Sequence, residues 1–189
     1  VSRMQPANRL DLLLSATACL VPRFDNLLVT IIGSGSEERQ RLERQAAELQ
    51  VDQHFRFLGP VYDEGDLAPW FLSADAFVYP VNIGLSLMHA LGYGLPVVTS
   101  NAIEKQNPEI VAHEHGVNGL TYADGNPQAL ADALAQLLAD EQLRQQLSRG
   151  ALATVEGEYN VPQMVDGFVA AIGYAVQHGS KLGGGAASA

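Results

Sequence analysis

Two glycine-containing segments could hold an anionic ligand with backbone N–H groups. Residues 32–36 (IGSGS) lie between a predicted strand and a predicted helix, and Gly33 and Gly35 would let a ligand approach the backbone closely. The helix that follows opens with two glutamates, which would repel a phosphate, and the third glycine of a dinucleotide fingerprint is missing. A tight turn between strand and helix therefore explains this segment at least as well as a ligand contact.

The second segment, residues 80–100, has more features of an anion site. A strand is predicted to end before it, and a helix to begin just after Gly84 with no acidic residue in its first turn. Backbone N–H groups near Gly84, Leu85 and Ser86 would lack helical partners and could bind a phosphate at the carboxyl end of a strand. The alternative is a buried helix whose glycines only permit close packing. Of the two, the sequence favours phosphate binding.

Arginines and histidines near these segments are further candidates. Arg3, at the end of a predicted strand, could close over a diphosphate with its planar guanidinium, and Arg9 could assist, although such arginines are more often solvated. His89 falls one turn beyond the proposed anion site and could face the ligand or be a partly buried structural histidine. His113 and His115 lack a third ligand at suitable spacing, so they are interpreted as solvated loop residues and no metal site is predicted.

The elements that would position these residues alternate along the chain. Compact hydrophobic runs are typical of strands buried on both faces, and they lie at residues 27–32, 54–58, 75–79, 96–99 and 119–122, with 1–3 as a possible strand end. Helical patterns lie between them at residues 9–20, 37–49, 66–73, 85–93 and 107–113. This alternation predicts an α/β fold with a doubly wound, Rossmann-like parallel sheet of about six strands.

The last third of the chain is predicted to be helical. Asn126 and Pro127 are typical of an N-cap followed by proline at the first helical position, Asp140 begins another helix, and residues 161–176 form a final amphipathic helix. We expect this C-terminal helical tail to pack on the sheet, which gives one domain over residues 1–178. Residues 179–189 are small and featureless, and we interpret them as a flexible tail or a cloning remnant.

Composition and charge exclude several classes of protein. The 189 residues are 47% hydrophobic and 17% charged, which suffices for one domain with a sizeable core. With 11 basic and 21 acidic residues the net charge is −10, which disfavours nucleic acid and anionic membranes as partners. The single cysteine, Cys19, fits a reducing compartment, and no apolar run could span a bilayer, so we expect a cytoplasmic location and no transmembrane segment.

Five stretches of the chain, in order over roughly residues 1–176, resemble the C-terminal, donor-binding domain of the family 4 retaining glycosyltransferases of the GT-B fold (the group 1 glycosyl transferases). VSRMQPANRLDLLLSA is similar to the family's opening V-G-R-L…K-G…LL-A, and LLVTIIGSGSEERQRLERQAAEL to its L-x-I-x-G-x-G strand and helix. VDQHFRFLGPV is similar to V-x-F-x-G-x-V. SADAFVYP with GLSLMHALGYGLPVVTS resembles the stretch around the E-x7-E motif, and NPEIVAHEHGVNGLTYADGNPQALADAL resembles P-E-I-V…G-x-N-G-x-L…D…LA-x-A.

The resemblance implies the second of two Rossmann-like domains that face each other across a cleft, with a nucleotide diphosphate sugar as donor substrate, no metal and no cofactor. The N-terminal acceptor domain would be absent from these residues. The family's catalytic arginine, which neutralises the donor diphosphate, matches Arg3, whereas the position of its lysine is occupied by Asn8. The donor-binding positions expected here are Asn8, Arg9, Gly33, Gly35, Gly59, Pro60, Val61, Asn82, Gly84, Leu85, Ser86 and His89.

Two positions depart from the family's E-x7-E motif. The glutamate that contacts the donor sugar is Val81 here, and the glutamate that contacts the ribose hydroxyls is His89. Val81 cannot form a hydrogen bond with a sugar, so Asn82 or backbone N–H groups would have to supply that contact, while His89 could still bind a ribose hydroxyl. The resemblance implies either a branch with a different sugar contact, which we favour, or a domain without transfer activity.

The predicted function is the donor-binding half of a retaining glycosyltransferase of the hexosyltransferase type. It would transfer a sugar from a nucleotide diphosphate sugar to an acceptor hydroxyl in polysaccharide or glycoconjugate synthesis, in the cytoplasm and peripheral to the inner membrane in the full-length enzyme. Alone, these residues should bind donor weakly and turn over little or nothing. Two alternatives stay open, a GT-B relative with other chemistry such as a nucleotide-sugar epimerase and a non-enzymatic doubly wound interaction module.

Overall fold

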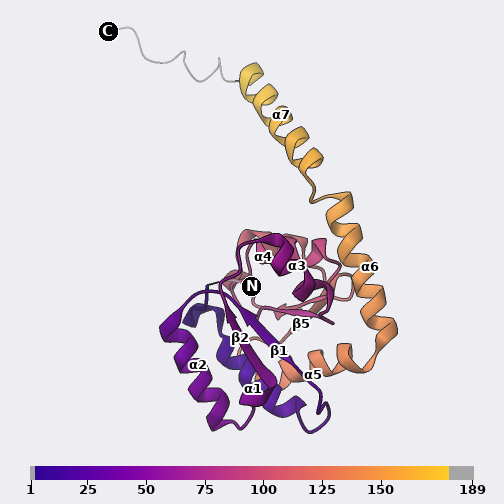
Figure 1. The fold of residues 1–189 in the computed structure, drawn as a ribbon. Coiled ribbons are helices and arrows are strands. Elements are labelled where there is room, and N and C mark those ends of the chain that lie inside the picture. The colour runs from indigo at the N-terminus through magenta and orange to yellow at the C-terminus, as the bar shows by residue number, and fades with distance from the viewer. Residues whose placement is uncertain (1–2, 179–189) are drawn as a thin grey trace.

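The computed structural model describes residues 3–178, and over this range the predicted alternation of strands and helices is present (Figure 1). The strands are β1 (Val29–Ile32), β2 (Phe55–Gly59), β3 (Phe77–Val78), β4 (Val97–Ser100) and β5 (Gly119–Tyr122). The α-helices are α1 (Leu10–Leu20), α2 (Ser36–Glu48), α3 (Glu64–Leu72), α4 (Ser86–Gly92), α5 (Pro127–Ala139), α6 (Glu141–Gly157) and α7 (Val161–His178). The predicted bounds of the five strands and of α1 to α4 are confirmed to within about two residues.

Every strand pairing between these elements is parallel. β1 pairs with β2, from Val29 opposite Phe55 to Ile32 opposite Gly59, and β4 pairs with both β3 and β5. The predicted doubly wound α/β class is therefore confirmed. The predicted strand count is too high, because residues 3–178 contain five strands in sheets of two and three. Of the predicted strand end at 1–3, residues 1–2 lie outside the described range and Arg3 is not in a strand.

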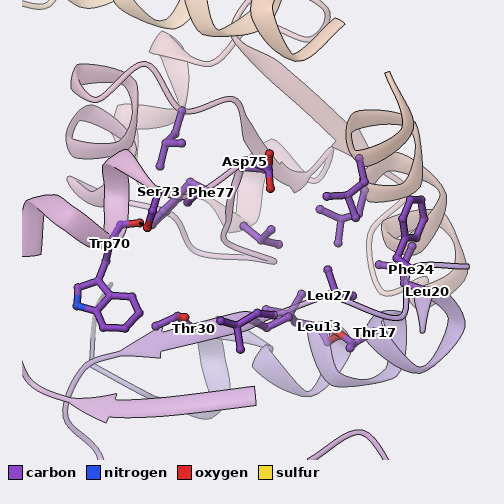
Figure 2. Close-up of a pocket in the computed structure, with 18 of the residues that line it drawn as sticks. Leu13, Thr17, Leu20, Phe24, Leu27, Thr30, Trp70, Ser73, Asp75 and Phe77 are labelled. Atoms are coloured by element: carbon purple, nitrogen blue, oxygen red, sulfur yellow. Dashed lines mark hydrogen bonds between the residues drawn. The ribbon is translucent and has the colours of Figure 1, made fainter. Parts of the chain in front are cut away.

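A groove of about 510 Å³ separates the two sheets between β1 and β3 (Figure 2). Most of the residues that line it are apolar, among them Leu13 and Leu20 of α1, Phe77 of β3 and Leu134 of α5. Within the described range, β1 pairs with β2 alone and β3 with β4 alone, so each of the two strands that border the groove has an edge without a strand partner. The groove thus lies where one continuous sheet would need a further strand.

Helices cover both faces of the three-stranded sheet. Successive residues of a strand point to opposite faces, and Val97 and Val98 of β4 are both fully buried but in different apolar clusters. Val98 packs in the cluster formed by α1 and α5, and Val97 in the cluster formed by α3 and α4. This burial on both faces explains why the strands are compact hydrophobic runs in the sequence.

The helix predicted at residues 107–113 is a 3₁₀-helix instead, η4 (Pro108–Ala112). Its backbone bonds span three residues, as between His113 N and Ile110 O at 2.9 Å. Three further short 3₁₀-helices are η1 (Pro6–Asn8), η2 (Asp52–His54) and η3 (Ile103–Lys105). Asn107 lies just before η4, and its side chain forms a hydrogen bond with the loop after β3.

The C-terminal helices begin where the sequence predicts, but not all of them pack on the sheet as predicted. Asn126 Oδ1 accepts from the backbone N–H of Gln128 at 3.0 Å, so the predicted N-cap is confirmed. The predicted start of a helix at Asp140 is confirmed as well, and Asp140 caps this helix by accepting from the backbone N–H of Leu143 at 2.9 Å. Helix α6 buries Leu147 and Ala151, whereas α7 buries no side chain and extends away from the rest of the fold (Figure 1).

The prediction that residues 161–176 pack on the sheet is therefore wrong, because the large apolar side chains of α7 are exposed in the part of the chain that the structure describes. The predicted tail at 179–189 lies outside the described residues. Between residues 3 and 178, no helix is both long and apolar enough to cross a membrane.

Candidate functional site

The candidate site is the edge formed by the carboxyl ends of the parallel strands. The segment after β1 holds Gly33 and Gly35, the segment after β2 begins at Gly59, and the segment after β3 leads through Asn82 into α4. The first two touch directly, since Gly33 N donates to Gly59 O at 2.8 Å. Open α/β sheets bind ligands in the crevice outside these strand ends. The structure thus brings the predicted segments to one edge.

Three asparagines connect the N-terminal segment to the loop after β3. The buried Asn8 donates from Nδ2 to Arg3 O at 2.8 Å, and its Oδ1 accepts from Asn82 Nδ2 at 3.4 Å. Asn107 Nδ2 donates to both Asn82 O and Asn82 Oδ1, at 3.0 and 3.1 Å. Asn8 was expected among the donor-binding residues, in the position of a lysine, and in the structure its amide fixes the backbone of Arg3.

The loop between β3 and α4 is held firmly from within the fold. Val81 is buried, Asn82 adopts a left-handed backbone with φ 66°, and Ile83 N donates to Gln106 Oε1 at 2.8 Å. A Cβ added to Gly84 would lie 3.4 Å from Asn107 Nδ2, so Gly84 packs against the side chain of Asn107. Leu85, by contrast, is 74% exposed at the start of α4, so this loop presents its α4 end to solvent.

The turn after β1 is closed by the N-terminal segment. Met4 N donates to Ser34 O at 2.6 Å, and a Cβ on Gly35 would lie 2.5 Å from Met4 O. Gly35 also has φ +128°, a conformation that side chains rarely adopt. The need for glycine at this position is thus explained by backbone packing, which is the structural alternative that the sequence left open; a ligand contact at Gly33 and Gly35 stays a prediction.

The turn after β2 is more open. Gly59 has φ +76°, a Cβ there would meet no atom within 4 Å, and Pro60 is exposed. Val61 anchors the turn by packing against the α3–α4 cluster, and Asp63 caps α3 by accepting from Gly65 N at 2.8 Å. The segment expected beside a nucleotide base is therefore accessible to a ligand.

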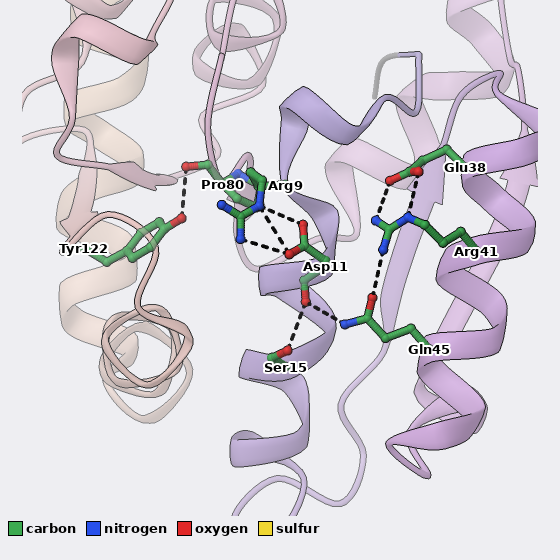
Figure 3. Close-up of polar contacts among 8 residues, drawn as sticks. All are labelled: Arg9, Asp11, Ser15, Glu38, Arg41, Gln45, Pro80 and Tyr122. Atoms are coloured by element: carbon green, nitrogen blue, oxygen red, sulfur yellow. Dashed lines mark hydrogen bonds and ion pairs between the residues drawn. The ribbon is translucent and has the colours of Figure 1, made fainter.

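Arg9 forms an ion pair with Asp11 (Figure 3). Its guanidinium donates to both carboxylate oxygens of Asp11, from Nη2 at 3.0 Å and from Nε at 3.0 and 3.2 Å. The hydrogen bond with Asp11 raises the pKa of Arg9. Part of its charge is thus already neutralised, so Arg9 offers less to a diphosphate than the sequence indicates.

Beyond the predicted residues, α3 and α4 form a polar cluster at the same edge. Glu64 Oε1 accepts from the hydroxyl of Tyr93 and contacts His89 Nε2 at 3.0 Å. These hydrogen bonds, that from Tyr93 above all, lower the pKa of Glu64. His89 is thus a partner of a carboxylate that stands on another helix. The four-residue spacing of His89 and Tyr93 could have indicated that they share one helical face. The contact with Glu64 could not be inferred in this way, because Glu64 is 25 residues from His89 in the sequence.

The other two histidines considered in the sequence form hydrogen bonds with the backbone, and the prediction of a solvated loop residue is wrong for His113, which is partly buried. His113 Nε2 lies 3.1 Å from Val97 O, and His115 Nδ1 accepts from Thr121 N at 2.9 Å. Burial lowers the pKa of His113, which is consistent with a neutral imidazole bonded to the backbone. Nowhere in residues 3–178 do three or more His, Cys, Asp or Glu side chains gather as they would to hold a metal.

The fold is thus a doubly wound α/β domain whose strand-end loops meet at one edge, the place where domains of this class bind ligands. Residues 1–140 match the family model of the group 1 glycosyl transferases, so the chain belongs to this family, as its sequence predicts. It is 33% identical over 168 residues to a D-inositol 3-phosphate glycosyltransferase of Frankia alni, a match that covers 83% of this chain and 40% of the relative. The chain thus spans about two fifths of that relative's length.

Solved structures confirm the predicted GT-B, Rossmann-like fold. The crystal structure of Anabaena HepE in complex with UDP superimposes with a TM-score of 0.78 at 21% identity, over 91% of this chain and 47% of that one. The C-terminal domain of LpcC, a group 1 family protein of Francisella tularensis, superimposes with a TM-score of 0.73 at 19% identity, over 85% of this chain and 84% of that one. At these identities the likeness concerns the fold.

Proposed function

We propose that residues 1–178 are the nucleotide-sugar-binding domain of a glycosyltransferase, which moves a sugar from a nucleotide diphosphate sugar to an acceptor hydroxyl. The observation that carries this proposal is the meeting of the segments after β1, β2 and β3 at one strand-end edge, in a chain of the group 1 family. It is supported by HepE, a structural neighbour whose crystals contain UDP. An acceptor domain would be supplied by further polypeptide, in keeping with the share of the relatives that this chain covers.

The diphosphate would lie between Arg3 and the first turn of α4. Arg3 is exposed at this edge with its backbone fixed by Asn8, and α4 begins after Gly84 with no acidic residue in its first turn. A cation and backbone N–H groups would stabilise the negative charge that develops on the departing nucleotide diphosphate. Arg3 is thus the group whose loss should weaken nucleotide binding most.

The finer chemistry follows from the family resemblance. We propose a retaining, hexosyl-transferring reaction in polysaccharide or glycoconjugate synthesis, with the donor sugar held by Asn82 or backbone groups because Val81 is apolar and buried. We also propose that donor binding needs no metal. Chelation with EDTA should therefore leave nucleotide affinity unchanged, and a loss of binding that Mg²⁺ restores would contradict this point.

Calorimetric titration of the 189-residue chain with UDP, GDP and ADP tests the central proposal. One nucleotide should bind saturably, and Arg3→Ala should weaken it about tenfold, the effect of losing one charge-assisted contact. The matched control is Arg23→Ala, since Arg23 precedes β1 at the opposite end of the strands. The absence of binding by all three nucleotides at millimolar concentration would contradict a donor-binding role.

A further inference from the structure

Glu64 stands where a ligand at the strand-end edge could reach its carboxylate. It is the first residue of α3, five residues after the open turn at Gly59, and its side chain is 61% exposed. The two hydrogen bonds described for it above both go to Oε1. Over residues 3–178, Oε2 accepts none of the hydrogen bonds that the structure contains. One carboxylate oxygen thus accepts both hydrogen bonds, in a side chain that is mostly exposed.

The two donors to Glu64 are held in place by packing. His89 and Tyr93 lie four residues apart on one face of the α4 segment, and the buried ring of Phe71 contacts both. It stacks on Tyr93 with a centroid distance of 4.9 Å and lies tilted against His89 at 4.6 Å. Phe71 belongs to α3, as Glu64 does. The carboxylate is therefore oriented before any ligand arrives, which lowers the entropic cost of binding.

The negative charge of Glu64 favours hydroxyl groups as its ligands. The hydrogen bonds from Tyr93 and His89 lower the pKa of Glu64, and the bond to Glu64 raises that of Tyr93. Glu64 is thus ionised and acts only as an acceptor, while Tyr93 stays protonated. An exposed anion does not attract a diphosphate, but a ribose offers vicinal hydroxyl donors, which Asp or Glu side chains bind in nucleotide sites of doubly wound folds.

We propose that Glu64 accepts hydrogen bonds from the ribose hydroxyls of the donor nucleotide, with His89 and Tyr93 as positioning residues. This inference rests on the proposed nucleotide-binding function and adds a residue to it. Positions 81 and 89 of this chain carry no carboxylate, and Glu64, bonded to His89 from the neighbouring helix, supplies one. The ribose would lie between the base, at the Gly59 turn, and the diphosphate, at the start of α4.

A purely structural role for Glu64 makes a different prediction. As an acidic residue in the first turn of α3, bonded to α4, it could serve only to stabilise the two helices. In that case Glu64→Gln would lower the melting temperature but leave the selectivity for ribose over deoxyribose unchanged. Selectivity is thus the readout that separates the two roles.

The experiment measures affinity for UDP, GDP and ADP and for the 2′-deoxy form of whichever binds. The unchanged chain should bind the ribonucleotide about tenfold more tightly than the 2′-deoxynucleotide, because one hydrogen bond to a charged group is lost. Glu64→Gln should weaken ribonucleotide binding about tenfold and bring the ratio of the two affinities close to one. Tyr93→Phe, which keeps the ring on Phe71, should lower the ratio in the same direction and serves if Glu64→Gln does not fold.

Asp66→Asn is the matched control, since it removes one charge from the same turn of α3 without touching His89 or Tyr93, and it should leave the ratio unchanged. If the unchanged chain binds a ribonucleotide but Glu64→Gln retains the full selectivity, the role of Glu64 is refuted while the nucleotide site stands. The same holds if the unchanged chain does not distinguish the two sugars. If no nucleotide binds, the proposed function fails and this inference with it.

Discussion

The candidate site is positioned by the side chains of three asparagines, Asn8, Asn82 and Asn107. Asparagine tolerates the left-handed backbone that residue 82 adopts, and its amide both donates and accepts, so one side chain can bridge two segments. Residues of this kind are hard to find in a sequence, because their partners lie far away: Asn8 and Asn82 are separated by 74 positions. Sequence reasoning placed both at the site but assigned them ligand contacts only.

Asn107→Ala should lower the free energy of unfolding by about 1–2 kcal/mol, because it removes two hydrogen bonds that hold the loop after β3. Urea denaturation measures this loss. Asn26→Ala, at an exposed position between α1 and β1, is the control and should change stability by less than about 0.5 kcal/mol. Equal effects of the two substitutions would argue against a positioning role for Asn107.

Gly35→Ala should destabilise the chain by about 2 kcal/mol or more, because it combines an unfavourable φ with a clash against Met4 O. Gly125→Ala separates these causes, since Gly125 has φ +71° but open space around a Cβ, and should cost about 1 kcal/mol. Urea denaturation of both variants gives the comparison. A loss at Gly35 no larger than that at Gly125 would mean that the N-terminal segment does not pack on this turn.

His113 should make stability depend on pH. Burial lowers its pKa in the folded chain below the ordinary value near 6.5, so the unfolded chain binds the proton more readily. Its contribution is therefore present above about pH 6.5 and is lost as the pH falls from there through the lowered pKa. Unfolding free energies between pH 7.5 and 4.5 should fall less steeply for His113→Gln. Superimposable pH profiles would contradict this assignment.

At the scale of elements, periodicity and capping residues predicted the positions of helices well and their packing less well. The caps at Asn126 and Asp140 are local, so the sequence reveals them directly. Helices α6 and α7 both have an apolar face, yet only α6 buries part of it. An amphipathic pattern states that a face is apolar but not what covers it, and this is why the predicted packing of residues 161–176 is wrong.

The two helices should therefore respond differently to substitution. Leu147→Ala in α6 removes a fully buried side chain and should cost about 2–5 kcal/mol of unfolding free energy. Phe168→Ser in α7 alters a residue that is 63% exposed and should change that free energy by less than about 0.5 kcal/mol. Urea denaturation again decides, and a large loss at Phe168 would show that α7 packs on the domain in solution.

For the molecule as a whole, the sequence predicted the doubly wound class because each buried strand is a compact apolar run followed by a helix. It did not predict the division into two sheets, since the groove between β1 and β3 depends on how the elements are placed in space. The location of the candidate site at the carboxyl ends of the strands could be predicted, because the loops that follow parallel strands meet at that edge of the sheet. The pairing of Arg9 with Asp11 and the cluster around Glu64 required coordinates.

The most direct test of the proposed function is to observe where a nucleotide binds. Backbone amide NMR shifts of the isotope-labelled chain would be followed during titration with the nucleoside diphosphate that binds in calorimetry. We predict saturable shifts at Gly59, Gly84 and Ser86, with little change in α7 or at the groove between the sheets. Shifts confined to the groove or to α7, or none at the strand-end edge, would contradict the assignment of this edge as the donor site.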